Sequence, residues 1–483
     1  MKYDVVIIGS GLGGLVCASL LSRHGRHVLV LERQTIAGGC MQSFQRRGHS
    51  FDTGLHYIGG LAEGQRLQRI FDYLGLMKLP WKRLDADGFD HITIGQQTFR
   101  FAEGYDHFVD TLAEQFPHER QSLTQYVQML QRIDEEPLDS QGMYNNFGFS
   151  AYNYLHETFH DDLLINVLSG SALKMELRPE SLPLFTFAHG NSSFIGSSWR
   201  LQGSGNLLVQ TLTDNIRANG GDIICKTEAT EFIERNGQLE AVRCTNGETY
   251  EADIFISDIH PVQTFAMVKD SHMLKNVFRR RFNMLQNTFG AFTTSLLLKP
   301  ESLRYFNHNK FIYRNANVWT FYEESKTVGG VMVSARVPED NSQYVRQIDL
   351  LTPMTWDACQ QWADTSVGHR CADYKAMKER LANECIELAE TQIPGLGQMI
   401  EEQYTSTPLT WRDYTLTPNG SAYGLRKDCR NLLLTMLSPR TPIPNLLLTG
   451  QNLMLHGVEG VTMTALKTCA EVEGQTLIKK ILN

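Results

Sequence analysis

The sequence lacks the features that mark several large classes of protein. No stretch approaches the roughly 18 consecutive apolar residues that a membrane-spanning helix requires. No basic block or stripe occurs, and the formal net charge is −8, which argues against a nucleic-acid partner. We therefore expect a globular protein that does not cross a membrane. Contact with a membrane surface leaves only a weak trace in a sequence. The sequence therefore does not decide whether a membrane is a partner.

The nine cysteines form no recognisable pattern. They are scattered, with no C-x-x-C pair and no metal-ligand spacing, so we expect reduced thiols and no metal site. The first expected strand begins at Tyr3, which leaves no room for a signal peptide. These observations predict a cytoplasmic protein, with docking at the inner face of a membrane left open.

Motifs of several enzyme classes are also missing. The chain has no G-x-S-x-G, no H-E-x-x-H and no P-loop. Its 483 residues are too many for one simple core and suggest two or three lobes. The sequence therefore gives no indication of an enzyme that uses one of these three motifs.

A dinucleotide-binding fingerprint is present near the N-terminus. Residues 3–8 form a short apolar run typical of a buried strand, which leads into Gly9-Ser10-Gly11-Leu12-Gly13-Gly14. A segment of helical spacing follows and ends near Gly25, and a second apolar run over 27–31 closes on Glu32. Strand, G-x-G-x-x-G, helix, strand and acid thus follow in the order that dinucleotide binding requires.

Each part of this fingerprint has a physical role. Gly9 permits the tight turn, Gly11 lets the backbone approach a pyrophosphate, and Gly14 lets the helix pack closely on the strand. The helix N-terminus offers free N–H groups and a partial positive charge to the phosphates. Glu32 lies 18 residues past Gly14 (32 − 14), where an acid can accept hydrogen bonds from a ribose hydroxyl.

A second glycine pair, Gly38-Gly39, follows the acid and is succeeded by Cys40 and by the segment 51–59, FDTGLHYIG. On these residues the sequence resembles flavoproteins of the phytoene desaturase, carotenoid isomerase and retinol saturase group, within the larger amine-oxidase-like FAD superfamily. The resemblance is closest to the retinol saturase branch. An arginine often stands in that superfamily where this chain has Cys40, so an amine-oxidase activity is not expected.

The resemblance implies an α/β fold in which an α+β substrate lobe is inserted into a Rossmann-like FAD-binding domain. We assign residues 1–60, 200–260 and 440–483 to the discontinuous FAD-binding domain, and 61–199 and 261–439 to the substrate or lid lobe.

Coarse patterns within the inserted lobe add detail. Segment 106–133 has the spacing of two amphipathic helices broken at a proline, and their apolar stripes favour core packing over lipid docking. Residues 140–160 indicate a loop followed by a helix start. Apolar, β-rich runs occur at 290–298, 318–322 and 330–335.

The C-terminal segment completes the expected cofactor site. We expect residues 444–451 to form a strand that ends at a glycine followed by a polar residue, and residues 456–461 to begin the terminal helix. The resemblance implies that this turn holds the ribityl chain and pyrophosphate, with the helix N-terminus aimed at the flavin N1–C2=O locus, where the dipole stabilises the reduced flavin. It also implies that backbone near Ala229 packs on the adenine. The residues expected to contact FAD are Gly9, Gly11, Leu12, Gly13, Gly14, Glu32, Arg33, Gly38, Gly39, Cys40, Ala229, Gly450, Gln451, Gly460 and Val461.

Residues for the reaction itself are harder to identify. His56 and His456 lie nearest the expected cofactor turns and are candidates for catalysis or for structural hydrogen bonding. Cys40 can be reactive, but packing under the flavin loop is favoured. Aromatic side chains can line a substrate tunnel or fill the core, and the sequence does not choose between these roles. The aromatic candidates for substrate contact are Tyr57, Trp319, Trp411 and Tyr423.

No second complete G-x-G-x-x-G occurs, so FAD is expected in the one dinucleotide site. NAD(P)H, if used, would visit the flavin transiently; another protein, a quinone or oxygen are the other electron partners. The resemblance implies an oxidoreductase acting on carbon–carbon bonds of an apolar isoprenoid or polyene, and the His56-bearing segment favours a saturase-like reductase.

Two other functions remain alternatives. One is a redox-neutral carotenoid-type cis–trans isomerase. The other is a prenyl-binding escort protein such as the Rab GDP-dissociation inhibitors, against which the intact glycines and Glu32 argue. The exact substrate, the covalent or non-covalent attachment of FAD and the oligomeric state stay open.

Overall fold

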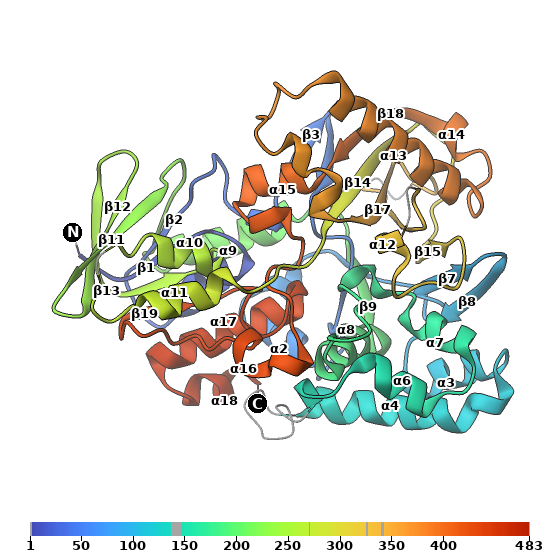
Figure 1. The fold of residues 1–483 in the computed structure, drawn as a ribbon, viewed down its shortest axis with the longest axis horizontal. Helices are drawn as coiled ribbons and strands as arrows, with labels where there is room; N and C mark the ends of the chain where they lie inside the picture. Colours follow the sequence, from blue (N-terminus) through green and yellow to red (C-terminus); the bar gives the residue numbers. More distant parts are fainter. Residues whose placement is uncertain (1, 137–145, 270, 325–326, 340–341, 483) are drawn as a thin grey trace.

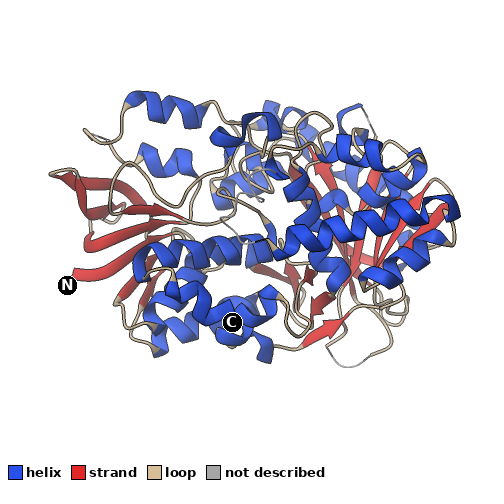
Figure 2. Cartoon of the chain, turned by 90° about the horizontal axis from the view of Figure 1, so that it is seen from below, coloured by secondary structure: helices blue, strands red, loops and turns tan. Residues whose placement is uncertain are grey.

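The computed structural model describes residues 2–136, 146–269, 271–324, 327–339 and 342–482. Two lobes lie side by side, and each is built on a seven-stranded sheet (Figure 1). Seen from below, strands gather toward the two ends of the molecule, and helices fill the space between them (Figure 2). The chain passes between the lobes several times, so neither lobe is one continuous segment.

The first sheet, at the left of Figure 1, is a parallel sheet extended by an antiparallel hairpin. Its order is β10-β2-β1-β13-β12-β11. β12 pairs with the first residues of β13, and β19 pairs in parallel with the last residues of β13. The predicted Rossmann-like α/β fold is confirmed by this arrangement. Its strands are β1 (Lys2–Ile8), β2 (Val28–Leu31), β10 (Asp222–Ile224), β11 (Ala229–Arg235), β12 (Gln238–Cys244), β13 (Thr249–Ser257) and β19 (Leu446–Leu448).

Helices cover this parallel sheet, which explains its nearly continuous apolar strands. Every residue of β2 and β19 is buried. The helix α1 (Leu12–Arg23) packs against both α9 (Asn206–Ala218) and α17 (Gly457–Glu473). Because α1 and α17 begin at the same edge of the sheet, their N-termini can serve one site.

The second sheet is largely antiparallel and carries the other lobe, with order β18-β14-β17-β16-β15-β7-β8. The long helix α13 (Ala372–Glu390) packs on β14, β16 and β17. The strands are β7 (Asp90–Ile94), β8 (Gln97–Phe101), β14 (Gly290–Leu298), β15 (Asn309–Tyr313), β16 (Gly330–Ala335), β17 (Gln347–Met354) and β18 (Ile400–Ser406).

A layer of helices closes the lower edge of this second lobe (Figure 1). The two helices predicted over 106–133 are present as α3 (Tyr105–Ala113) and α4 (Arg120–Glu135), and a short 3-10 turn at Pro117 separates them. α4 packs on α8 (Leu184–Gly196). The expected loop over 140–160 lies partly outside the described residues, and its helix is α6 (Ala151–Thr158).

One strand prediction is wrong. The run 318–322 turns and enters the short helix α12 (Phe321–Glu324), because Trp319 points into the lobe core and its indole N–H donates to the Ser169 hydroxyl at 3.0 Å. An apolar run can therefore belong to a core turn as well as to a strand. Within the described ranges, no helix combines the length and the apolar character needed to span a bilayer.

Candidate active site

A crevice opens at the carboxyl ends of β1, β2 and β13, where doubly wound sheets bind their ligands. The cavity has a volume of about 310 Å³. Its walls come from the loops after β1 and β2, the segments around Ala229 and Asp258, the stretch 411–423 and the turn before α17. Parts of the chain that are far apart in sequence thus converge on one elongated site.

Glu32, at the end of β2, is 7% exposed and holds the glycine loop. Its Oε2 accepts hydrogen bonds from the Ser10 N–H at 3.1 Å and from the Ser10 hydroxyl. Its Oε1 accepts from the Gln34 N–H at 2.6 Å. A carboxylate has about four acceptor sites, so capacity for a ribose hydroxyl remains.

Asp258, which directly follows β13, lies against the glycine loop. The N–H groups of Gly11 and Gly14 donate to its carboxyl group. A Cβ built on Gly11 or Gly13 would collide with the carboxyl oxygens of Asp258. Burial raises the pKa of Asp258 to about 7. These glycines are therefore required by the protein's own packing as well as by any phosphate.

The opposite wall brings a second helix N-terminus to the crevice. α17 begins at Gly457, and its N-cap residue His456 makes no side-chain cap bond. Gly457, Val458 and Val461 line the cavity, so the first turn of α17 faces it. Free N–H groups and the helix dipole make this end of the crevice favourable for negative charge.

The predicted cofactor residues fall into two groups in the structure. Four of them do not line the crevice: Gly14 packs against the Gly9 carbonyl, Gly38 against Val209 and Gly450 against Asp258, while Gly460 packs against Leu455 and lines the neighbouring cavity. The others line the crevice directly. They are Gly9, Gly11, Leu12, Gly13, Glu32, Arg33, Gly39, Cys40, Ala229, Gln451 and Val461.

Cys40 lies in this wall as a protonated thiol. Burial raises its pKa to about 12, and the nearby Asp258 carboxylate adds to the shift. A thiol with so high a pKa is a poor nucleophile at neutral pH. The geometry supports the packing role for Cys40.

A second, smaller cavity of about 170 Å³ adjoins the crevice, and we call it the chamber. His56, Tyr423, Gly457 and Val458 line both cavities, so the two share a wall. Residues of α2 (Arg66–Tyr73), α8 and the turn at 173–174 close the far side. A ligand in the chamber would thus lie directly beside a ligand in the crevice.

His56 stands where the two cavities meet. Its Nδ1 lies 3.7 Å from Asp349 Oδ2, and its Nε2 is buried without a hydrogen-bond partner among the described residues. Burial lowers the pKa of His56, and the charges of Asp349 and Asp52 oppose this shift. Arg336 completes the surroundings, with its guanidinium 2.8 Å from Asp52 Oδ2 and 3.7 Å from Asp349 Oδ2.

Lys174 is a largely buried amine on the chamber wall. Its Nζ lies 3.9 Å from Asp90 Oδ2 and 3.9 Å from the ring centroid of Phe194. The Tyr57 hydroxyl donates to the same Asp90 carboxylate at 2.8 Å. Burial lowers the pKa of Lys174 to about 8, so the amine can gain or lose a proton near neutral pH.

His456 donates from Nε2 to the Lys174 carbonyl at 2.8 Å, and its ring packs on Tyr423 with centroids 4.5 Å apart. Burial lowers the pKa of His456 to about 4. These contacts give the predicted catalytic candidate His456 a positioning role on the chamber wall. His56 is the candidate whose ring nitrogen is free.

An acidic and basic cluster closes the chamber at the N-terminal end of α17. Burial raises the pKa of Glu459 to about 7, and the same cause lowers the pKa of His189 to about 4. Arg66 Nη1, Thr186 Oγ1 and His189 Nε2 also line the chamber and lack hydrogen-bond partners among the described residues. Buried polar groups of this kind bind water or ligand atoms.

The predicted substrate residues do not lie together. Tyr57 and Tyr423 line the chamber. Trp411, on α15 (Pro408–Thr415), lines the crevice instead. Trp319 is 4% exposed in the lobe core and is not part of the chamber lining, so its predicted substrate contact is not supported.

Sequence reasoning missed five residues that shape the two cavities. Only Asp258 could have been found from the sequence. An acid that directly follows a strand parallel to β1 is expected at the edge of the sheet where ligands bind. The other four come from helices and turns of the inserted lobe or from α17, and no spacing linked them to the fingerprint. They are Arg66, Lys174, His189 and Glu459.

Comparisons with known proteins agree with this geometry. Residues 7–74 match the family model of an NAD(P)-binding Rossmann-like domain. An all-trans-retinol 13,14-reductase from Danio rerio is 26% identical over 99% of this chain and 88% of its own length. A prolycopene isomerase from Daucus carota is 24% identical over 93% of this chain and 76% of its own length.

Solved structures show the same fold at lower identity. A putrescine oxidase has a TM-score of 0.65 at 14% identity, covering 98% of this chain and 100% of its own. A Rab GDI from Plasmodium falciparum has a TM-score of 0.54 at 13% identity, covering 98% of each chain. The solved structures share the fold, and the retinol 13,14-reductase and prolycopene isomerase relatives, similar over nearly the whole of this chain, fit the expected group of carotenoid isomerases and retinol saturases.

Proposed function

We propose that the protein is an FAD-dependent oxidoreductase that acts on the C=C bonds of an apolar polyene, in the direction of saturation. One observation carries this proposal: a crevice suited to a dinucleotide shares a wall with the chamber. The Danio rerio relative, whose name is a retinol 13,14-reductase, supports reduction as the direction.

The residues of the crevice fit FAD. Glu32 has acceptor capacity for the adenosine ribose, and the loop at Gly11 and Gly13 brings backbone to the α1 N-terminus for the pyrophosphate. The first turn of α17, at Gly457 and Val458, offers N–H groups and a positive dipole end to a reduced flavin ring. When bound, FAD supplies the hydride chemistry of the reaction.

Saturation of a C=C bond adds one hydride and one proton, so the chamber must also hold a proton donor. His56 lines both cavities and has a free Nε2, which places a titratable nitrogen at the junction. Lys174, with a pKa of about 8, is a second group that can hold and release a proton. We assign His56 the proton-donor role because it lies nearer the shared wall.

Redox-neutral isomerisation is the second candidate, because the Daucus carota relative is named a prolycopene isomerase. An isomerase would move no proton into its product and would tolerate loss of His56. A prenyl-binding escort function has less support, because the glycine loop and Glu32 are arranged for a dinucleotide.

We further propose that the electron donor binds only transiently. The described residues form one glycine-lined dinucleotide crevice, and FAD would fill it. NAD(P)H would therefore reach the flavin from outside and leave after transfer. A cytoplasmic location, with contact at a membrane surface, is part of this proposal.

The test is anaerobic incubation of purified protein with NADPH or NADH and candidate retinoids or carotenoids, followed by product mass. Saturation adds the mass of two hydrogens, desaturation removes it, and isomerisation leaves it unchanged while altering retention time. Protein that purifies without flavin and takes up none from added FAD would contradict the proposal outright.

A further inference from the structure

Two further cavities, of about 500 Å³ each, lie beside the crevice. The inner one adjoins the crevice, and Cys40, Trp411 and Tyr414 line both. The outer one adjoins the inner one, and Lys378, Thr405 and Tyr414 line both. Cavities of this size are typical of small-molecule and cofactor sites. We call the outer and inner cavities together the side groove.

The side groove runs alongside the crevice. At one end, the Tyr414 carbonyl accepts hydrogen bonds from Arg33 Nη2 at 3.0 Å and from Gln34 Nε2 at 2.8 Å, so it lies close to the loop after β2. At the other end, Thr53 lines both the inner cavity and the crevice, and it precedes His56 by three residues (56 − 53). A ligand in the side groove would therefore lie beside the cofactor expected in the crevice.

The side groove is basic within an acidic protein. Four basic and two acidic side chains line it, whereas the whole chain has a net charge of −8. Of the two acids, Glu379 is exposed, and Asp52 Oδ2 lies 2.8 Å from the guanidinium of Arg336. A cavity with local positive charge attracts anions. The basic residues are Arg46, Arg370, Lys375 and Lys378.

Lys378, on α13, is a half-buried amine without a counter-charge. Its Nζ donates to the Thr405 carbonyl at 2.7 Å, and it forms no ion pair within the described ranges. Burial lowers the pKa of Lys378 to about 8, and the charge of Arg370 adds to the shift. An ammonium group has three donors, so two stay available to a bound anion.

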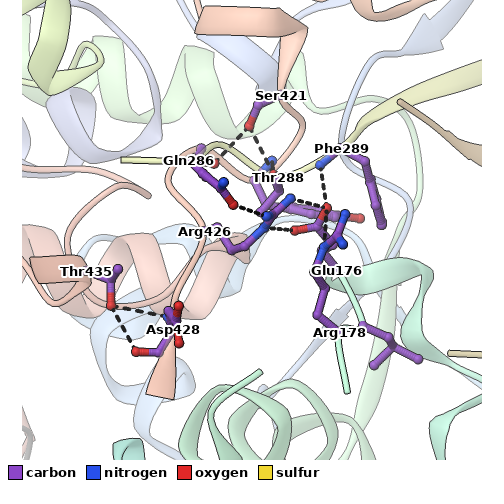
Figure 3. Close-up of polar contacts among 12 residues, drawn as sticks. Glu176, Arg178, Gln286, Thr288, Phe289, Ser421, Arg426, Asp428 and Thr435 are labelled. Carbon is purple, nitrogen blue, oxygen red and sulfur yellow. Dashed lines mark hydrogen bonds and ion pairs between the residues drawn. The ribbon is translucent and has the colours of Figure 1, made fainter. Parts of the chain in front are cut away.

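Two cations elsewhere in the protein are satisfied internally. Figure 3 shows Arg426 pointing at Glu176, and it donates to both carboxylate oxygens, at 2.6 and 3.1 Å. The buried Lys427 donates from Nζ to three backbone carbonyls, at 3.0, 2.7 and 2.8 Å. Lys378 has neither arrangement. The difference indicates that its partner comes from outside the chain.

Two other polar groups of the side groove lack partners among the described residues. The Arg370 guanidinium pairs with Asp413 and donates from Nη1 to the Tyr374 hydroxyl at 2.8 Å, but its Nε is buried and unpaired. The Thr293 hydroxyl, on β14, is 4% exposed and is also unpaired. Buried polar groups of this kind bind water or ligand atoms.

Tyr414 offers an aromatic ring where the three cavities meet. It is 51% exposed and lines the crevice as well as both parts of the side groove. Aromatic side chains stack on the flat faces of nucleotide bases. Basic groups beside an accessible aromatic ring thus fit a ligand that carries both phosphates and a base.

We propose that the side groove docks the electron donor of the enzyme, a reduced nicotinamide dinucleotide. Its phosphates lie at Lys375 and Lys378, and one of its bases stacks on Tyr414. Its nicotinamide passes Trp411 into the crevice. This proposal rests on the proposed function, because it names where that enzyme's donor binds. A quinone fits less well, since it has no negative charge for Lys378 to pair with.

The redox step is a hydride transfer. The nicotinamide loses one hydride and is oxidised, and the bound flavin takes up its two electrons and its hydrogen. The oxidised dinucleotide then leaves through the same groove. A site made of side chains, several of them exposed, suits a donor that must bind and leave in every turnover.

The test is calorimetric titration of the FAD-loaded protein with NADP⁺ and, separately, with NAD⁺. We expect Lys378→Met to weaken binding by about tenfold or more, because a charge-assisted contact is lost while the aliphatic stem remains. Lys378→Arg should retain binding. Lys375→Glu, at an exposed site three residues away on the same helix face, should also weaken it without disturbing the fold. Binding should weaken as salt rises.

Lys299→Met is the matched control. The Lys299 Nζ also donates to a backbone carbonyl, that of Gln398 at 2.7 Å, but Lys299 does not line the side groove. This variant should bind the dinucleotide as the unaltered protein does. Tyr414→Ala should weaken binding and Tyr414→Phe should not, because the ring rather than the hydroxyl stacks.

Two outcomes would overturn the proposal. One is unchanged NADP⁺ and NAD⁺ affinity in both Lys378→Met and Lys375→Glu. The other is loss of FAD affinity in place of dinucleotide affinity, which would make the side groove part of the FAD site.

Failure of the proposed function would be visible separately. Reduction of the flavin by NADPH or NADH is followed anaerobically without polyene, and protein reduced with dithionite is mixed with polyene. Slower flavin reduction in the variants, with normal product from their dithionite-reduced forms, supports the side groove. No product from dithionite-reduced protein that still binds the dinucleotide contradicts only the proposed function. Product from dithionite-reduced protein that binds neither NADP⁺ nor NAD⁺ contradicts only the side groove.

Discussion

The crevice and the chamber adjoin at His56, yet their walls are made differently. The crevice wall includes glycine loops at Gly9, Gly11, Gly13 and Gly39 and the first turn of α17. The chamber is bounded by side chains, many of them ionisable. The crevice therefore requires the absence of side chains, whereas the chamber requires particular ones. Substitutions should separate the two requirements.

The largest effect is expected at the glycine loop. In Gly11→Val the new side chain would collide with the Asp258 carboxyl group and displace the loop. We expect flavin affinity to fall by at least about 100-fold, which corresponds to a few kcal/mol of overpacking. Absorbance of the purified protein and titration with FAD measure this.

The control is Gly25→Ala, at the far end of α1, where no atom lies within 4 Å of a new Cβ. It should cost about 1 kcal/mol of backbone strain and keep the flavin. Retention of flavin by Gly11→Val would show that the loop does not limit cofactor binding.

The next effect is expected in the chamber wall. His56→Asn should keep the flavin spectrum but lower turnover by about 10²- to 10⁴-fold, because a proton donor is lost. Steady-state kinetics with a saturating polyene measure the effect, and His272→Asn, at an exposed site, is the control. A fully active His56→Asn enzyme would rule out proton donation by His56 and favour isomerisation.

The third prediction concerns one acid from each cavity whose pKa is raised by burial. Asp258 and Glu459 both have pKa values of about 7, raised by burial from 3.8 and 4.5. Between about pH 4 and pH 7 each is protonated in the folded state and ionised in the unfolded state. Their contribution to stability is therefore full at low pH and is lost as pH rises towards 7.

Asp258→Asn or Glu459→Gln should each flatten this pH dependence by on the order of 3 kcal/mol in the unfolding free energy of the apoprotein. Only Asp258→Asn should also change how flavin affinity depends on pH, since Asp258 lines the crevice. Denaturant titrations and FAD titrations across pH measure both. Identical pH profiles for the variants and the unaltered protein would contradict the assigned protonation.

The smallest effect concerns thiol reactivity. Cys40, with a pKa of about 12, should stay unmodified by iodoacetamide at neutral pH, while the exposed Cys371 should react first. Mass mapping of brief labelling reactions measures the order. Preferential labelling of Cys40 would show that the crevice wall opens or that its thiol is activated.

The same contrast explains what could be predicted from the sequence. The strand, glycine loop, helix and Glu32 are contiguous and obey local rules, so the Rossmann-like half of the fold was predictable from residues 3–32. Gly39, Ala229 and Val461 were placed through family resemblance, and each lines the crevice.

The chamber was not predictable because its residues meet only after folding. Lys174 and Glu459 are 285 residues apart (459 − 174), and each would look like a surface charge in its own segment. For Trp319 the sequence left substrate contact and core packing open, and the structure places its side chain in the lobe core. The conserved geometry of a cofactor leaves a local pattern, whereas a chamber assembled from separate helices and turns leaves none.

Anaerobic single turnover tests the central claim most directly. The protein-bound flavin is reduced, excess donor is removed, and a candidate polyene is added while the visible flavin band and product mass are followed together. We predict that the flavin reoxidises in step with a product heavier by two hydrogens, one molecule for each flavin. A flavin that stays reduced while the polyene is only isomerised, or that stays reduced with no product, would contradict the account.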